Sequence, residues 1–150
     1  MTDIFSARKR SAIMKSIKGK DTKPEIAVRS IVHRMGYRFR VNQGMLPGNP
    51  DIVLKKHKKV IFVNGCFWHG HLKCRRSRLP TSNENYWKNK IIKNMARDKK
   101  QIKLLHNQGW NTLVVWTCEI QDKKKISEKI ANYLSSSELK NDIRRKIRKT

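Results

Sequence analysis

Cysteine and histidine side chains gather in one short segment of the chain and indicate a metal site. Cys66, His69, His71 and Cys74 lie within nine residues, and Cys118 is the only other cysteine among the 150 residues. An odd number of cysteines does not favour a disulfide framework. Three thiolates and one imidazole form a donor set typical of structural zinc. We therefore predict zinc at the three cysteines and one of these histidines; the alternative is three unrelated thiols and two surface histidines.

A second candidate centre starts at Asp51, which follows a proline and opens an apolar segment. This pair resembles the PD motif of metal-dependent nucleases, in which a carboxylate holds Mg²⁺ against a phosphate, although Pro-Asp pairs are also common in turns. Such nucleases usually carry an acid and a lysine on the next strand, whereas residues 62–64 read FVN. His69 is then the candidate general base, since a neutral imidazole accepts protons near pH 7. Asp98 is the candidate for orienting that imidazole.

The charge balance points to a polyanionic partner. The chain has 36 Lys and Arg against 11 Asp and Glu, a formal net charge of +25. Such an excess repels itself unless an anion offsets it, which favours nucleic acid over a solvated basic surface or an anionic membrane. We expect no membrane-spanning helix, because no apolar run reaches about 18 residues. The start of the chain has no signal-peptide core, so we expect a cytoplasmic protein.

The first predicted helix begins close to a further acidic residue. Thr22 and Glu25 have the spacing of a capping box, and Pro24 is tolerated in a first turn. Gly36 is a suitable residue to end this helix. Capping is thus an adequate explanation for Glu25 without any chemistry.

Strands and helices alternate along the rest of the chain. Predicted strands cover 37–41, 51–54, 59–64 and 110–118, and predicted helices cover about 84–107 and the segment around 126–134. The apolar run in 59–64 indicates a strand covered on both faces. The expected order is α-β-β-β-α-β-α.

The long helix determines how the last two strands pair. A helix of this length between strands that end at Asn64 and Cys118 predicts a right-handed crossover and parallel strands. Parallel strands end at the same edge of a sheet. Cys66 and Cys118 can therefore meet, although 52 residues of sequence separate them.

We expect one domain over residues 1–135. A basic arm of about 20 residues precedes the core and includes Met14 at helical spacing with other apolar residues. The arm suits a groove contact on DNA, or it packs on the protein itself. Residues 136–150 are polar and basic and form a tail that could be flexible.

Several motifs together resemble one family, the very short patch repair (Vsr) DNA mismatch endonucleases. They are DTKPE (21–25), PGNPDIV (47–53), IFVNGCFWHGH (61–71), NYWKNKI-x-x-N-x-x-RD (85–98) and GW-x-x-L-x-VW-x-C (109–118). The match spans about residues 6–134. The resemblance implies an α/β, restriction-endonuclease-like fold with a mixed central sheet flanked by helices. It also implies nicking of one strand of duplex DNA, 5′ to the T of a T·G mismatch left by deaminated 5-methylcytosine.

The resemblance assigns roles in the reactive centre. Asp51 matches the Mg²⁺-binding aspartate, the backbone carbonyl of Val63 a further metal ligand, and His69 the catalytic histidine. Glu25 matches an acid near the active site. Asn64 departs from the pattern, because some members carry a histidine there.

The same comparison assigns the zinc and DNA contacts. His71 becomes the histidine that joins the three cysteines on zinc, in a segment (71–74) one residue longer than in the shortest members. Phe67, Trp68 and Trp87 match aromatic residues that enter or pack against the base stack at the mismatch. Met14 lies where the arm reaches the minor groove. Core packing is the alternative role for the aromatic residues.

Two other functions share many of these features. A restriction-type endonuclease would cut paired duplex, and a zinc-containing DNA-binding module would have no catalysis. The resemblance also implies a bacterial-type, nucleoid-associated enzyme. We expect it to be a monomer, with mismatch-repair proteins as candidate partners.

Overall fold

The computed structural model describes residues 8, 21–41 and 44–148, the last twelve of these by their backbone alone. Met14 and the rest of the arm lie outside the described residues. In chain order the elements are the helix α2 (Lys23–Arg34), the strands β1 (Arg40–Val41) and β2 (Ile52–Leu54), the 3-10 helix η1 (Lys55–His57), β3 (Lys59–Asn64), η2 (Arg75–Ser77), α3 (Glu84–Asn107), β4 (Asn111–Trp116), η3 (Thr117–Gln121) and α4 (Lys123–Arg148). Their order agrees with the predicted α-β-β-β-α-β-α.

The four strands form one mixed sheet in the order β1-β2-β3-β4. β1 and β2 are antiparallel, as are β2 and β3, whereas β3 and β4 run parallel with Asn64 opposite Trp116. The prediction of parallel pairing across the long helix is therefore confirmed. Because these two strands end together, the segments that follow them start at the same edge of the sheet.

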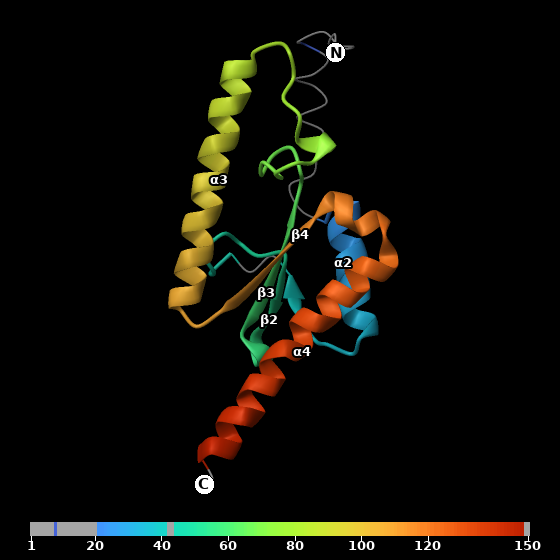
Figure 1. Cartoon of the computed structure of the whole chain (residues 1–150), viewed down its shortest axis with the longest axis vertical. Helices are drawn as coiled ribbons and strands as arrows, with labels where there is room; N and C mark the ends of the chain where they lie inside the picture. The colour runs from blue at the N-terminus through green and yellow to red at the C-terminus, as the bar shows by residue number, and fades with distance from the viewer. Residues whose placement is uncertain (1–7, 9–20, 42–43, 149–150) are drawn as a thin grey trace.

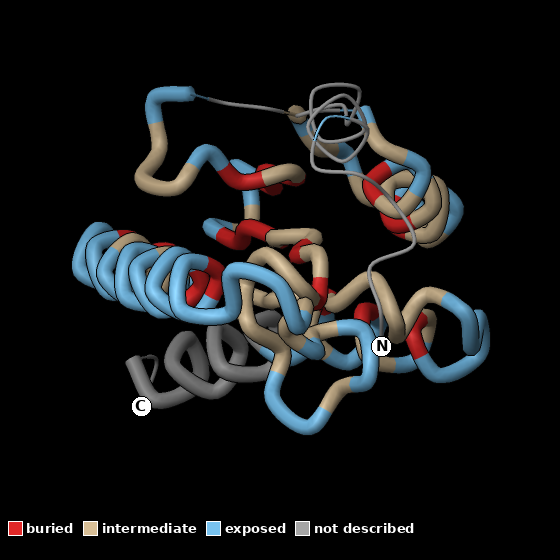
Figure 2. The backbone as a smooth tube through the Cα atoms, turned by 90° about the horizontal axis from the view of Figure 1, so that it is seen from above, coloured by how far each residue is buried: buried red, intermediate tan, exposed pale blue. Residues whose placement is uncertain are grey.

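Helices cover both faces of the sheet (Figure 1). On one face α2 and α4 pack against the strands, in a core cluster of Val28, Val32, Ile52, Leu54, Ile61, Val115, Ile126, Ile130 and Leu134. On the other face α3 packs against them, in a smaller cluster of Val53, Val60, Leu105 and Trp110. Neighbouring residues of β2 and β3 alternate between the clusters, as side chains of a strand must. Figure 2 shows the buried stretches gathered between the helices.

The edges of the predicted elements differ from the structure at three places. β1 has two residues rather than five, because Tyr37 and Phe39 pack against the larger core cluster from outside the ladder. β4 ends at Trp116, where the Glu119 carboxylate accepts the backbone N–H at 3.3 Å and η3 begins. Cys118 therefore lies on a 3-10 helix just beyond the strand. α4 continues as helix beyond residue 135, where we had expected the domain to end.

A buried lysine ties β3 to α4. Lys59 is 1% exposed, and its ammonium donates to the carbonyls of Tyr133 (2.6 Å) and Leu134 (2.5 Å). These partners offset part of the cost of burying the charge.

Within the described residues, no helix combines the length and apolarity needed to cross a membrane.

Candidate active site and metal-binding cluster

Asp51 stands directly before β2, at the edge where β3 continues beyond its antiparallel partner. Its Oδ2 accepts a hydrogen bond of 2.6 Å from the backbone N–H of Val63. The carboxylate thus takes the place of a ladder partner. In an extended strand the N–H and C=O of one residue point to the same side, so the Val63 carbonyl also faces the side of Asp51. The two predicted oxygen ligands therefore lie next to each other.

Burial makes the Asp51 carboxylate unusually basic. Loss of solvent raises its pKa from 3.8 to about 6, against a lowering effect of the hydrogen bond from Val63. The charge of Glu25 raises the pKa further, while Arg29 and His69 lower it. A half-buried carboxylate beside a second acid is a suitable place for a divalent cation, since the cation offsets both the desolvation and the repulsion.

This raised pKa predicts how Asp51→Asn changes stability. The folded state holds the proton more tightly than the unfolded state, so the stability from protonated Asp51 is complete below about pH 4 and is lost as pH rises through about 6. At pH 7.5 the buried charge costs at most about 3 kcal/mol. Without Mg²⁺, the variant should therefore melt a few degrees above wild type at pH 7.5 and show only about a third of that gain at pH 4.5. A gain of the same size at both pH values would contradict this account.

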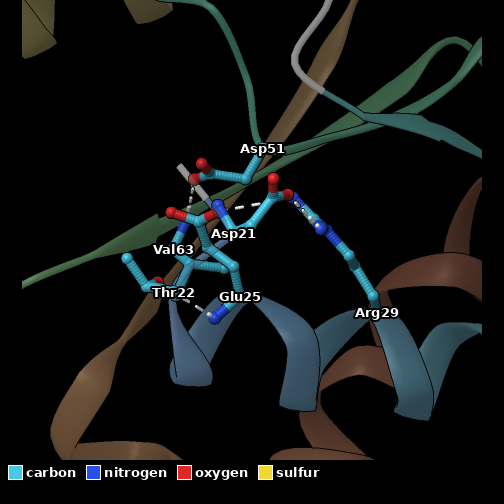
Figure 3. Close-up of polar contacts among 6 residues, drawn as sticks. All are labelled: Asp21, Thr22, Glu25, Arg29, Asp51 and Val63. Carbon is cyan, nitrogen blue, oxygen red and sulfur yellow. Dashed lines mark hydrogen bonds and ion pairs between the residues drawn. The ribbon is translucent and has the colours of Figure 1, made fainter. Parts of the chain in front are cut away.

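Glu25 lies at the start of α2 and is 5% exposed. As predicted for a capping box, Thr22 Oγ1 accepts from the Glu25 N–H, at 3.5 Å. The Glu25 carboxylate, however, accepts from the backbone N–H of Asp21 at 2.8 Å instead of from Thr22. Arg29 then donates to both acids, at 2.7 Å to Asp21 and 3.3 Å to Glu25 (Figure 3). This network fixes a second carboxylate beside Asp51.

The two histidines of the central loop face different partners. His69 Nδ1 lies 2.5 Å from Asp98 Oδ2 on α3, whereas His71 Nδ1 lies 3.4 Å from Cys118 Sγ. Gly70 between them has φ +64°, and a Cβ there would lie 2.5 Å from Met95 Sδ. Glycine therefore lets the chain reverse against α3. Asp98 thus lies within hydrogen-bond distance of His69, and its orienting role stays a prediction.

One cleft joins the reactive residues. It has a volume of about 780 Å³. Asp51 and Val63 line it from the sheet, Glu25 from α2, His69 from the loop and Asp98 from α3. Carboxylates, an imidazole and a strand carbonyl in one cleft make a donor set that fits Mg²⁺ and a bound water.

The predicted zinc ligands also come together. The ligand atoms of Cys66, His71, Cys74 and Cys118 all lie within 4.8 Å of one another. In a tetrahedral site, Zn–S bonds of about 2.3 Å place sulfurs roughly 3.8 Å apart, so small side-chain rotations complete the geometry. Between His71 and Cys74, Lys73 adopts a positive φ of 58°. The cluster thus fits a tetrahedral metal ion and favours the metal site over unrelated thiols.

The thiols of this cluster do not ionise alike. Burial acts to raise the pKa of Cys66, but hydrogen bonds from Thr117 and from the Cys118 backbone outweigh it and lower that pKa to about 7. Burial raises the pKa of Cys118 to about 12, and interaction with Cys66 adds to the shift. Without a cation, ionisation of a second thiol in the cluster is therefore unfavourable. A bound divalent metal would make it favourable.

An aromatic cluster lies beside the cleft. Phe67, Trp68 and Trp87 meet edge to face, with ring centroids 5.2 to 5.9 Å apart. Trp87 is 8% exposed, whereas Phe67 and Trp68 are only half-buried. Tyr86 meets Trp87 edge to face, with ring centroids 5.1 Å apart, and is 58% exposed. Trp87 therefore supports the cluster from below, and Lys90 Nζ lies 5.7 Å above the Trp68 ring.

Comparison with known proteins shows which family the chain belongs to. The family model described as "DNA mismatch endonuclease Vsr" matches residues 2–76. The "Type II nicking enzyme V.XorIIP" of Xanthomonas oryzae pv. oryzae is 45% identical over 137 residues, 91% of this chain and all of that protein. The "DNA mismatch endonuclease Vsr" of Escherichia coli (strain K12) is 37% identical over 128 residues, 85% of this chain and 81% of that protein. The chain belongs to the Vsr endonuclease family.

A solved structure supports the fold of this Vsr-family endonuclease. The catalytic domain of the homing endonuclease I-Bth0305I superposes with a TM-score of 0.52 at 23% identity, covering 78% of this chain and 97% of that one. The predicted restriction-endonuclease-like fold with a mixed sheet is thus confirmed. Membership of the family makes the chain a DNA endonuclease of mismatch repair with DNA as its substrate.

Sequence reasoning missed some residues of the site. Arg29 and Asp21 hold Glu25, and Arg97 lines the cleft next to Asp98. The sequence did contain a signal for Arg97, because this residue is the neighbour of Asp98 in the long predicted helix. Asn64 lines the same cleft and is 8% exposed, so a buried amide stands at this position.

Proposed function

We propose that this Vsr-family endonuclease nicks one strand of duplex DNA 5′ to the T of a T·G mismatch and so starts very short patch repair. The observation that carries the proposal is the convergence of Asp51 and the His69–Asp98 pair in one cleft beside the aromatic cluster. The net charge of +25 suits a duplex substrate. We further infer a monomer in the bacterial cytoplasm at the nucleoid, with mismatch-repair proteins as candidate partners.

Each residue of the cleft has its own proposed role in hydrolysis. Asp51 and the Val63 carbonyl would hold Mg²⁺, with Glu25 close by, and the ion would supply Lewis-acid polarisation of the phosphate. Asp98 holds Nδ1 of His69, which leaves Nε2 to accept a proton from the attacking water. The water oxygen bonds to phosphorus and the bond to the leaving deoxyribose oxygen breaks. Cys66, His71, Cys74 and Cys118 would hold zinc, which would fix the loop that carries His69.

Phe67 and Trp68 are proposed to sense the mismatch. A T·G wobble pair stacks less well than a matched pair, so opening the base stack there costs less. Half-buried aromatic rings can replace the lost stacking, which is worth about 1–3 kcal/mol per base. The buried Trp87 beneath them keeps the rings in place.

Asp98→Asn should slow nicking by about 100-fold, because His69 would lose the partner that fixes its tautomer and position. The affinity for the T·G duplex should change by no more than about threefold, because the substitution leaves the fold and the aromatic cluster unchanged. Single-turnover nicking rates and duplex titrations measure the two effects. Wild-type rates in this variant would remove Asp98 from the mechanism.

A nicking assay on matched duplexes tests the proposal against its alternatives. Duplexes that carry T·G or T·A in the same sequence are incubated with the enzyme, with and without Mg²⁺, and without a chelator so that zinc stays bound. We expect nicks only with T·G and Mg²⁺. Cutting of the T·A duplex would favour a restriction-type enzyme, and binding without any cut would favour a non-catalytic zinc module.

A further inference from the structure

One stripe along α3 faces the cleft and is fixed at three points. Asn94 donates to the Trp68 carbonyl at 2.9 Å, and Asp98 holds His69. One turn further on, the Gln101 side chain packs against Gly48, whose absent Cβ would lie 3.0 Å from Gln101 Oε1. These three positions follow the i, i+4, i+7 spacing of one helix face. The rotation of α3 about its own axis is therefore set by three contacts. They reach the aromatic loop, His69 and the loop before Asp51.

Arg97 lies within this stripe, three residues after Asn94 and four before Gln101. It lines the cleft with Asp51, Glu25, His69 and Asp98. Of the described residues that line the cleft, Arg97 is the sole Lys or Arg. Arg97 is an exposed residue.

Two other cations, on elements that contribute to the cleft, are held by partners of their own. Arg29 donates to Asp21 and Glu25 at the start of α2. Lys59 is the lysine of β3, and its ammonium is buried against the carbonyls of α4 on the far side of the sheet. The cleft-lining end of β3 contributes Phe62, Val63 and Asn64, which carry no charge. Arg97 is thus the one Lys or Arg among the described residues that line the cleft, whereas Arg29 acts on Asp51 from α2 with its guanidinium held by Asp21 and Glu25.

We propose that Arg97 is a catalytic residue of the nicking reaction, whose guanidinium contacts the phosphate that is cut. This inference rests on the proposed function. Three carboxylates line a cleft that must admit a phosphodiester, so a cation is needed on the side away from Asp51 and Glu25. Hydrolysis adds negative charge to the phosphate oxygens in the transition state, and a planar guanidinium can bind two of them at once. Lysine supplies the charge without that paired geometry.

Arg97→Gln and Arg97→Lys test the proposal, with Lys103→Ala as a matched control. Lys103 is also exposed on α3 and is not part of the cleft lining, so its loss removes one charge without touching the centre. Relative to this control, Arg97→Gln should lower the single-turnover nicking rate on a T·G duplex by about 100-fold, the usual cost of one transition-state donor. Its affinity for the duplex should stay within about threefold of the control. Arg97→Lys should recover only part of the rate.

A phosphorothioate at the cut position gives a second readout. If Arg97 contacts one non-bridging oxygen, sulfur at that oxygen slows the wild-type enzyme more than the glutamine variant. The proposal is overturned if Arg97→Gln nicks at the rate of Lys103→Ala, if rate and affinity fall in parallel, or if the sulfur effect is equal in both proteins. Absence of T·G nicking by wild type in the same assay would instead overturn the proposed function.

Discussion

Asp51→Asn is expected to abolish nicking, with a loss of at least about 1,000-fold in the single-turnover rate. Asp51 is the half-buried carboxylate that faces the Val63 carbonyl in the cleft, and its loss removes a charged metal ligand. A metal ion contributes several kcal/mol of transition-state stabilisation, and each 1.4 kcal/mol or so is a factor of ten. Gel analysis of a labelled T·G duplex measures the rate.

The fold must survive for this result to count. Asparagine is of the same size and its amide oxygen can still accept from the Val63 N–H, so the circular dichroism spectrum and duplex affinity should match wild type. A well-folded variant that nicks within tenfold of the wild-type rate would place the metal elsewhere. Lost affinity together with lost nicking would mean that Asp51 acts in docking.

Cys118→Ser is expected to release the bound metal and to destabilise the whole domain. Cys118 closes the cluster from η3 and joins it to the loop that follows β3. Structural zinc contributes roughly 10 kcal/mol or more of binding free energy in small metal sites. A loss of even a few kcal/mol lowers the melting temperature of a domain of this size by about 10 °C. Metal analysis should find one zinc per chain in wild type and none in the variant.

The two histidines provide the matched control for this experiment. His71→Ala should lose zinc like the cysteine variant, because His71 lies 3.4 Å from Cys118. His69→Ala should keep zinc and the wild-type melting temperature while it loses nicking, because His69 faces Asp98. Equal zinc content and stability in all these proteins would rule out a structural zinc site. Loss of zinc from His69→Ala would show that the two centres are not separate.

The meeting of Cys66 and Cys118 was predictable because it follows from a rule of topology. A parallel pair needs a long crossover, which the predicted helix supplies, and parallel strands end at one edge of the sheet. Residue types then named the three cysteines and left open which histidine joins them. The separation of His69 from His71 followed from the family pattern, and Gly70 supplies its physical cause, since the chain reverses there in close contact with α3.

Other parts of the site depend on packing that no local pattern encodes. Arg29 reaches back to Asp21 because Asp21 adopts a positive φ of 55°, a backbone choice that periodicity does not specify. Lys59 begins an apolar strand and is buried because the Tyr133 and Leu134 carbonyls of α4 accept from its ammonium. Cys118 belongs to η3 because Glu119 ends β4 early. The contacts of Arg29 and Lys59 depend on tertiary packing. Cys118 was predicted to lie in a strand because no short-range signal shows where β4 ends.

Mapping the cut on a T·G duplex labelled on both strands is the most direct test of the account. With Mg²⁺ present, we predict one nick, 5′ to the mismatched T and in that strand only, and no product from Asp51→Asn. Cuts in both strands, a nick in the G strand, or equal cutting of the T·A duplex would contradict the account.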